Sequence, residues 1–223
     1  MTKSYQAVIW DYDGVIVDSH EFNKYACIAA AKQCGISVSD DEYTRHFYHG
    51  VSLRQGATNL LTHFGKLPQL ENYINAKIAM DPEYHERVRI YPHVISTIHQ
   101  LSAQHITQAI CSGARKALLE EFIARHNLGS CIQTIVSAED VATPKPSPEG
   151  YLLTIQKIGI PAHECLIVED AISGIQAARQ ARADVIAITN TESAVTLTRE
   201  HPTHIANGAD EIIQFMRTSR EKI

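Results

Sequence analysis

The sequence of 223 residues lacks the long apolar segments that characterise membrane and exported proteins. No apolar run approaches the ~20 residues that a membrane-spanning helix needs. The N-terminal segment reaches Asp11 and Asp13 before the apolar region of an export signal could form. Hydrophobic residues make up 44% of the chain and charged residues 20%, as in ordinary globular proteins. We therefore expect a folded protein that has no membrane partner.

Runs of lysine or arginine are also lacking. The chain has 20 basic and 25 acidic residues, which gives a formal net charge of −5 with histidine taken as neutral. Nucleic acids and anionic membrane surfaces are bound by basic patches. We therefore expect no nucleic-acid partner.

Cysteine is sparse and shows no pattern of a disulfide framework or a metal site. The five cysteines are odd in number and none are spaced as C-x-x-C. Cys111, Cys131 and Cys165 lie in or beside apolar segments. This usage is typical of reduced, buried thiols, and we expect a cytoplasmic protein.

Short apolar segments that alternate with helical patterns are the main structural signal. Near-continuous apolar runs are typical of strands buried on both faces, and their alternation with helices predicts a doubly wound, Rossmann-like parallel α/β sheet. The expected strands are residues 6–10, 108–111, 132–136, 165–168 and 183–188, with 203–206 as a candidate for a short further strand. The expected helices between and after them are residues 93–104, 114–127, 147–158, 173–181 and one that starts at Ala209.

A long helical insertion follows the first strand. Residues 18–90 show helical patterns and no convincing strand, although one crossover helix would suffice between parallel strands. The helices expected there are 20–34, 39–46, 53–63 and 68–80. We therefore predict a core of residues 1–17 and 92–223, interrupted by an all-helical cap of residues 18–91 that closes over a site.

Polar residues follow the predicted strands at their carboxyl ends, where open parallel sheets bind their ligands. Each of them alone has an ordinary explanation, as a turn, a helix cap or an exposed loop residue. Their occurrence together predicts one polar site. The residues are Asp11 and Asp13 after the first strand, Ser112 and Gly113 after the second, Lys145 beyond the third, and Glu169 and Asp170 after the fourth.

The chemistry of this set favours phosphoryl transfer. Crowded carboxylates repel one another unless a cation is present, and oxygen ligands at an open site favour Mg²⁺. Asp11 can then attack phosphorus as a nucleophile, and Asp13 can act as a general acid and base. The Ser112 hydroxyl and the N–H groups of Gly113 and its successors, at the start of the next helix, can bind phosphoryl oxygens. Lys145 can neutralise the charge that develops there.

Four segments resemble the motifs of the haloacid dehalogenase-like hydrolase superfamily. They are residues 8–19 (VIWDYDGVIVDS), 110–113 (ICSG), 144–149 (PKPSPE) and 168–178 (VEDAISGIQAA). The most similar branch holds phosphoglycolate phosphatases, sugar-phosphate phosphatases and β-phosphoglucomutase. The resemblance implies an α/β core with a helical cap, a Mg²⁺ cofactor, and a phosphatase that acts on a small phosphorylated metabolite.

The resemblance also implies a role for each residue of the predicted site. Dehalogenases of the superfamily lack an aspartate at the place of Asp13, which favours phosphate chemistry here. By resemblance, Asp11 is the nucleophile and a Mg²⁺ ligand, and Asp13 is the acid and base and gives its carbonyl to the metal. The resemblance assigns phosphate binding to Ser112, Gly113 and Lys145. It also makes Asp170 a Mg²⁺ ligand and Glu169 a ligand that binds the metal directly or through water.

Two alternative functions stay open, a phosphosugar mutase and a non-catalytic binding protein on the same scaffold. Residues 48–54 (YHGVSLR) resemble the mutase cap segment LKGVSR. His49 stands where the mutase has lysine, and Leu53 stands where it has the arginine that grips a second phosphate. Arg54 comes one residue late, so the mutase is disfavoured. The catalytic residues are all present, which disfavours the binding protein.

The cap and the histidines carry further hypotheses. Phosphonoacetaldehyde hydrolases use a cap lysine, and none stands beside Gly50. His20, Asn23 and His49 are candidates for polar contacts with substrate, because the family's cap contributes such groups. Histidine pairs spaced i, i+3 lack further zinc ligands, and we interpret them as solvated or packed side chains. The oligomeric state is expected to be a monomer or a homodimer.

Overall fold

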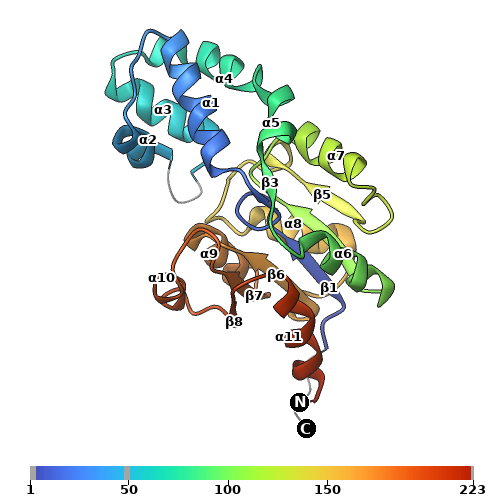
Figure 1. Cartoon of the computed structure of the whole chain (residues 1–223). Coiled ribbons are helices and arrows are strands. Elements are labelled where there is room, and N and C mark those ends of the chain that lie inside the picture. The colour runs from blue at the N-terminus through green and yellow to red at the C-terminus, as the bar shows by residue number, and fades with distance from the viewer. Residues whose placement is uncertain (1–3, 48–50, 222–223) are drawn as a thin grey trace. The chain divides into compact units, whose positions relative to one another are not determined.

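The computed structural model describes residues 4–47 and 51–221 and divides into two compact units (Figure 1). The first unit comprises the chain up to Val17 together with the chain from Ile90 onward, and the second comprises Asp18–Arg89. Within the described residues, none of the helices is long and apolar enough to span a membrane.

A six-stranded sheet forms the centre of the first unit, and every ladder in it is parallel. Its strand order is β5-β4-β1-β6-β7-β8. The strands are β1 (Ala7–Trp10), β4 (Thr107–Cys111), β5 (Thr134–Val136), β6 (Cys165–Glu169), β7 (Asp184–Ile188) and β8 (His204–Ala206). The predicted α/β fold with a parallel sheet is confirmed.

The strand order places a switch of winding direction beside β1. The chain proceeds from β1 to β4 and β5 on one side, then returns to β6 on the other side of β1 and continues to β7 and β8. In open parallel sheets, ligands bind in the crevice at the carboxyl ends of the strands where this reversal occurs. The residues that follow β1 and β6 therefore lie side by side at the position where a site is expected.

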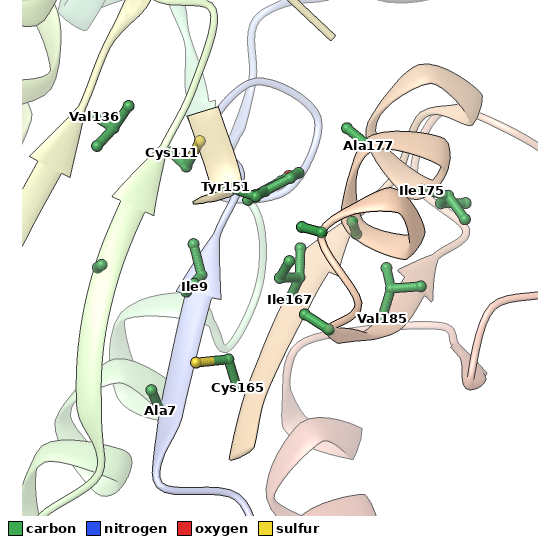
Figure 2. Packing of buried hydrophobic residues seen from close by; sticks show 14 of the residues in the cluster. Ala7, Ile9, Cys111, Val136, Tyr151, Cys165, Ile167, Ile175, Ala177 and Val185 are labelled. Atoms are coloured by element: carbon green, nitrogen blue, oxygen red, sulfur yellow. The ribbon is translucent and has the colours of Figure 1, made fainter. Parts of the chain in front are cut away.

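Helices cover both faces of the sheet. They are α6 (Val94–Ala103), α7 (Lys116–Arg125), α8 (Glu149–Ile158), α9 (Ile172–Gln180), α10 (Ala194–Thr198) and α11 (Asp210–Glu221), with 3-10 turns at Ala138–Asp140 and Ala162–Glu164. On one face, α8 packs on β4 and β5, and α9 packs on β6 and β7. Ile9, Ile167 and Val185 line one row across three neighbouring strands and belong to the apolar cluster under these helices (Figure 2).

A polar chain joins the other face of the sheet to α6. Trp10 and Gln108 are both fully buried, and the indole Nε1–H of Trp10 donates to Oε1 of Gln108 at 3.1 Å. The amide of Gln108 in turn donates to the carbonyl of Ile98 on α6 at 2.9 Å. Both buried polar groups are therefore satisfied without water.

The second unit is helical. Its elements are α1 (His20–Gln33), α2 (Asp40–Phe47), α3 (Leu53–His63), a 3-10 turn at Leu67–Gln69, α4 (Leu70–Ile78) and α5 (Asp81–Arg87). Leu60, Leu61 and Tyr73 are buried in its own apolar cluster, and the Tyr73 hydroxyl donates to the carbonyl of Cys27 at 3.0 Å. The unit thus has a core of its own, separate from the sheet's.

Short elements at the ends of the helical unit differ from expectation. The prediction of no strand within residues 18–90 was wrong, because β2 (Val17–Asp18) and β3 (Arg89–Ile90) form a two-stranded sheet. Strands of two residues show no periodicity that a sequence could display. The helix expected at 68–80 is divided into a 3-10 turn and α4, and α5 follows with Pro82 in its first turn, where proline is tolerated.

Two boundaries in the sheet unit also differ. The strand expected at 132–136 begins at Thr134, and the helix expected at 114–127 spans Lys116–Arg125. Helix α10 was not predicted, although Ser193 is a side-chain cap that accepts from the N–H of Thr196 at 3.1 Å. A helix of five residues has too few turns for an apolar stripe to show in the sequence.

We predict that Gln108→Ala lowers the free energy of unfolding by about 2–4 kcal/mol, because it leaves the buried Trp10 indole N–H without a partner, removes the side-chain hydrogen bond to the Ile98 carbonyl and opens a cavity. Urea denaturation measures the change. Gln156→Ala, at an exposed position on α8, is the matched control and should change stability by less than about 0.5 kcal/mol. Equal effects at the two positions would contradict the prediction.

Candidate active site

The loop after β1 holds Asp11 at the winding reversal. Strand β1 ends at Trp10, and the N–H of Asp11 donates to the carbonyl of Val168 at 2.9 Å, so Asp11 is anchored to β6. The chain then turns around the buried Tyr12, whose carbonyl accepts from the N–H of Ile16 at 2.8 Å. Gly14 has a φ of 83°, which favours glycine. Asp11 is thereby buried next to the end of β6.

Three buried carboxylates meet at this position. Asp11, Glu169 and Asp170 each offer an oxygen, and these oxygens all lie within 4.8 Å of one another. Among the described residues, no other group of three or more aspartate, glutamate, histidine or cysteine side chains is arranged so that it could hold a metal ion. The carboxylate of Asp13 is not part of the group, and Asp13 is partly exposed.

Lys145 joins two of these carboxylates. Its Nζ lies 2.7 Å from Oδ1 of Asp11 and 2.6 Å from Oε1 of Glu169, and it also donates to the carbonyl of Cys111 at 3.3 Å. The ammonium lies 4.9 Å from the centre of the Tyr151 ring. The predicted lysine therefore reaches the predicted nucleophile across the ends of β4, β1 and β6.

The carboxylate of Glu169 is fully engaged by the protein. Oε1 accepts from Lys145 and from the Tyr151 hydroxyl at 2.5 Å, and Oε2 accepts from the N–H groups of Asp170 at 3.1 Å and Ala171 at 3.4 Å. A carboxylate has about four lone-pair positions, so these donors fill it. A Cβ at Gly174 would lie 1.8 Å from Oε1, which shows how closely α9 approaches this side chain.

The carboxylate of Asp170 is held differently. Its Oδ2 accepts a hydrogen bond from the Thr191 hydroxyl, and a Cβ at Gly14 would lie 1.9 Å from the same oxygen. Glycine at position 14 therefore serves both the turn and the close approach of Asp170. Lys145 forms ion pairs with Asp11 and Glu169 but not with Asp170.

Burial and mutual repulsion shift the charges of the site. Burial, reinforced by the charge of Glu169, raises the pKa of Asp170 to about 7. Burial also raises the pKa of Asp11 well above its ordinary value, against the opposing charge of Lys145. Burial lowers the pKa of Lys145, but the charges of Asp11 and Glu169 outweigh it and raise that pKa overall. The ionised site is therefore short of positive charge.

The donor set fits a divalent cation. Three ionised carboxylates and one ammonium leave two unbalanced negative charges in a buried position. Oxygen ligands at an open site are those of Mg²⁺. The acidic cluster at the carboxyl edge of the sheet could therefore hold a metal ion of this kind.

Ser112 and Gly113 follow β4 directly, but not as expected. Ser112 is buried, its N–H donates to the carbonyl of Val136 at 2.9 Å, and its Oγ accepts from the N–H of Ala114 at 3.0 Å. The expectation that the pair starts the next helix was wrong, because α7 begins only at Lys116. The Lys116 N–H donates to Oε2 of Glu139 at 2.9 Å, so a side chain occupies this helix end.

Several groups near the site were not predicted. Tyr151 lies on α8, close to the end of β1 in Figure 2, and its place in the helix gave no sign of a polar role. Asn190 and Thr191 follow β7. Their place just after the fifth expected strand is the sequence signal that marks this pair.

The candidates from the helical unit have partners within that unit. Asn23 donates to Oγ of Ser19 at 3.2 Å, and the His20 ring lies edge-on to Tyr43 at 6.1 Å. His49 lies outside the described residues, as does Gly50.

Comparison with known proteins identifies the family. A family model described as haloacid dehalogenase-like hydrolase matches residues 8–188. The chain belongs to this family. The predicted superfamily is confirmed, and so is the prediction of an enzyme of the haloacid dehalogenase-like hydrolases. The phosphatases and mutases of the predicted branch are among the proteins that this hydrolase is similar to.

Three relatives illustrate the range of similarity. A phosphorylated carbohydrates phosphatase of Thermotoga maritima is 25% identical over 79% of this hydrolase and 81% of its own length. A validoxylamine A 7'-phosphate phosphatase of Streptomyces hygroscopicus subsp. limoneus is 23% identical over 86% and 90%. The chloroplastic protein SUPPRESSOR OF QUENCHING 1 of Arabidopsis thaliana is 24% identical over 92% of this hydrolase, which spans 20% of that longer protein.

Solved structures agree on the fold. A crystal structure from Bacteroides fragilis, described as a haloacid dehalogenase-like hydrolase, superposes with a TM-score of 0.83 at 22% identity and covers 94% of this hydrolase and 100% of that chain. A hydrolase from Pseudomonas syringae gives a TM-score of 0.75 at 21% identity, with 96% and 98% covered. At these identities the likeness supports the fold alone.

We predict that Gly174→Ala destabilises the hydrolase by about 1–3 kcal/mol, although alanine is normally preferred to glycine inside a helix. The new Cβ would lie 1.8 Å from Oε1 of Glu169, so the carboxylate or α9 must move. Urea denaturation measures the effect. Gly113→Ala is the control, because no atom lies within 4 Å of a Cβ there. A Gly174→Ala protein more stable than the wild type would refute this account.

We predict that without a divalent cation the fold loses stability as the pH rises from about 4 to about 7. The raised pKa of Asp170 makes the folded chain hold a proton that the unfolded chain has already released, and such a group favours folding at low pH. Asp170→Asn cannot ionise at this position, so the part of the loss that Asp170 contributes, on the order of 1–3 kcal/mol, should disappear, while the part that Asp11 contributes remains. Urea denaturation in chelator at pH 5 and pH 7.5 measures it. The same pH slope in both proteins would exclude Asp170 as the cause.

Proposed function

We propose that this chain is a Mg²⁺-dependent phosphoric monoester hydrolase that acts on a small phosphorylated metabolite through a phosphoryl group carried on Asp11. The observation that carries the proposal is the hydrogen-bonded group of Asp11, Lys145 and Glu169 beside Asp170, at the winding reversal of the sheet. Family membership and the phosphatase names of relatives support the reaction class.

In the first step, a carboxylate oxygen of Asp11 attacks phosphorus, an O–P bond forms, and the ester O–P bond breaks. Asp13 donates a proton to the leaving oxygen, which departs as an alcohol. Lys145 offsets the charge on the transferring group, and the hydroxyl of Ser112 hydrogen-bonds its oxygens. The partial exposure of Asp13, in contrast to the burial of Asp11, suits a group that must meet a leaving group from outside.

In the second step, water attacks the phosphorus of the aspartyl-phosphate and its proton passes to Asp13. The bond between phosphorus and the Asp11 oxygen breaks, which releases inorganic phosphate and restores the Asp11 carboxylate. Asp13 thereby returns to its protonated form, so it acts first as acid and then as base. Protons and charges balance over the two steps.

We assign the metal to Asp11, the backbone carbonyl of Asp13, and Asp170. When bound, Mg²⁺ would offset the negative charge of the carboxylates and of the phosphoryl oxygens. The donors that fill the Glu169 carboxylate favour a role in holding Lys145. A contact between Glu169 and the metal, direct or through water, would have to displace one of these donors.

The contacts of Leu53 and Arg54 favour a phosphatase over a phosphosugar mutase. Leu53 packs against the apolar cluster of the helical unit. The Arg54 guanidinium forms a bidentate pair with Glu71, at 2.8 and 3.2 Å. An arginine engaged in this way is not free to grip a second phosphate.

The remaining elements of the proposal follow the family. We propose that the helical unit, predicted as residues 18–91, is the cap that excludes bulk water during the reaction. The names of the relatives favour phosphorylated carbohydrates or similar metabolites as substrates. The excess of acidic over basic residues disfavours a nucleic-acid partner. The five cysteines are free and buried, which favours a reducing compartment such as the cytoplasm.

We predict that Asp11→Asn lowers phosphate release by at least about 10³-fold, because the amide cannot attack phosphorus. The assay measures inorganic phosphate from a panel of small phosphate monoesters, with Mg²⁺ and with chelator. Acid-quenched wild-type enzyme should carry a phosphoryl group on Asp11 by mass spectrometry, and Asp11→Asn should not. Circular dichroism checks that the variant is folded. Activity retained by Asp11→Asn would overturn the mechanism.

The same panel separates the alternatives. Isomer formation from hexose phosphates without phosphate release would identify a mutase. Failure to turn over any ester of the panel, with Mg²⁺ present, would favour a binding protein. Arg54→Ala is a control that should leave phosphate release unchanged, since Arg54 pairs with Glu71 at the exposed surface.

A further inference from the structure

The loop after β7 reaches the candidate metal site. Strand β7 lies beside β6 in the sheet, and β6 ends at Glu169, one residue before Asp170. Asn190 and Thr191 follow β7, at the same edge of the sheet. Neither residue belongs to the four motifs by which the family was recognised.

Asn190 ties this loop to the turn that follows β1. Its Nδ2 donates to the carbonyl of Gly14 at 2.8 Å. The turn at Gly14 connects directly to Asp13, whose carbonyl we assign to the metal. The loop after β7 is therefore anchored to the chain segment that carries two of the assigned ligands.

Thr191 holds the third ligand. Its hydroxyl donates to Oδ2 of Asp170, and the backbone of Gly14 closes on the same oxygen, because a Cβ there would lie 1.9 Å from it. Oδ2 is thus confined between the Thr191 hydroxyl and Gly14. The hydrogen bond at Oδ2 leaves Oδ1 as the oxygen that can face a cation.

We propose that Thr191, anchored through Asn190, is a positioning residue that orients the Asp170 carboxylate for Mg²⁺. The inference rests on the proposed function, since it needs the metal to bind at Asp170. Thr191 does not touch the cation in this account. It acts through Asp170, by holding one carboxylate oxygen and presenting the other.

Loss of the Thr191 hydroxyl should weaken Mg²⁺ binding by a predictable amount. Hydrogen-bond partners of metal ligands typically contribute 10- to 100-fold to metal affinity. Thr191 is exposed at the surface, so its replacement by valine need not disturb the core. Thr189, two residues earlier, makes its side-chain contact with Oδ1 of Asn207 at 3.4 Å and not with the site. Thr189→Val is therefore the same chemical change in the same loop.

The experiment titrates Mg²⁺ into the full chain by isothermal calorimetry, without substrate, for the wild type, Thr191→Val, Thr191→Ser and Thr189→Val. We expect Thr191→Val to weaken Mg²⁺ binding by about 10-fold. Thr191→Ser, which keeps the hydroxyl, and Thr189→Val should bind like the wild type. Circular dichroism spectra in chelator should agree among the four proteins, and each should unfold cooperatively, which excludes a general loss of structure.

A kinetic readout completes the test. With a phosphate ester that the wild type hydrolyses, Thr191→Val should need about 10-fold more Mg²⁺ for half-maximal activity, with kcat at saturating Mg²⁺ close to that of the wild type. Wild-type affinity in Thr191→Val, or equal loss in Thr191→Ser or Thr189→Val, overturns the role of the hydroxyl and leaves the proposed function standing. Absence of Mg²⁺ binding by the wild type overturns both.

Discussion

The ammonium of Lys145 is the contact on which the geometry of this site depends. It lies within hydrogen-bond distance of both Asp11 and Glu169, two carboxylates that arrive from different strands and are buried. Buried carboxylates are costly unless they are paired and hydrogen-bonded. One lysine offsets only part of the charge, and the high pKa values of Asp11 and Asp170 express the remainder. The fold therefore tolerates a charge imbalance at a position where a divalent cation could remove it.

The parallel sheet and two glycines make this crowding feasible. The winding reversal between β1 and β6 brings Asp11 next to Glu169 and Asp170 without any long loop. Gly14 and Gly174 then allow backbone to approach Asp170 and Glu169 more closely than any residue with a Cβ would permit. The carboxylates are consequently oriented by rigid elements. Catalytic sites need such fixed groups, because stabilising a transition state depends on their orientation as well as on their charge.

Much of this arrangement could be predicted from the sequence, because the charged residues of the site directly follow the predicted strands. Asp11, Glu169 and Asp170 directly follow runs such as AVIW and CLIV, whose pattern marks buried strands. Other features leave no such mark. The two residues of β2 show no period, and the start of α7 depends on Glu139, a side chain from a distant turn that caps Lys116. Contacts of this kind depend on tertiary structure, so local patterns do not reveal them.

Under the proposed function, the contacts of Glu169 and Lys145 suit a site that receives an anion despite its acidity. An ammonium has three donors. The Nζ of Lys145 donates to Oδ1 of Asp11 at 2.7 Å and to Oε1 of Glu169 at 2.6 Å. Its third hydrogen bond, to the carbonyl of Cys111, is longer at 3.3 Å. The third contact is the weakest and involves a neutral acceptor, so it is the one that a phosphoryl oxygen can replace at least cost. Glu169, held by the Tyr151 hydroxyl and two backbone N–H groups, would keep the lysine in place during the proposed exchange.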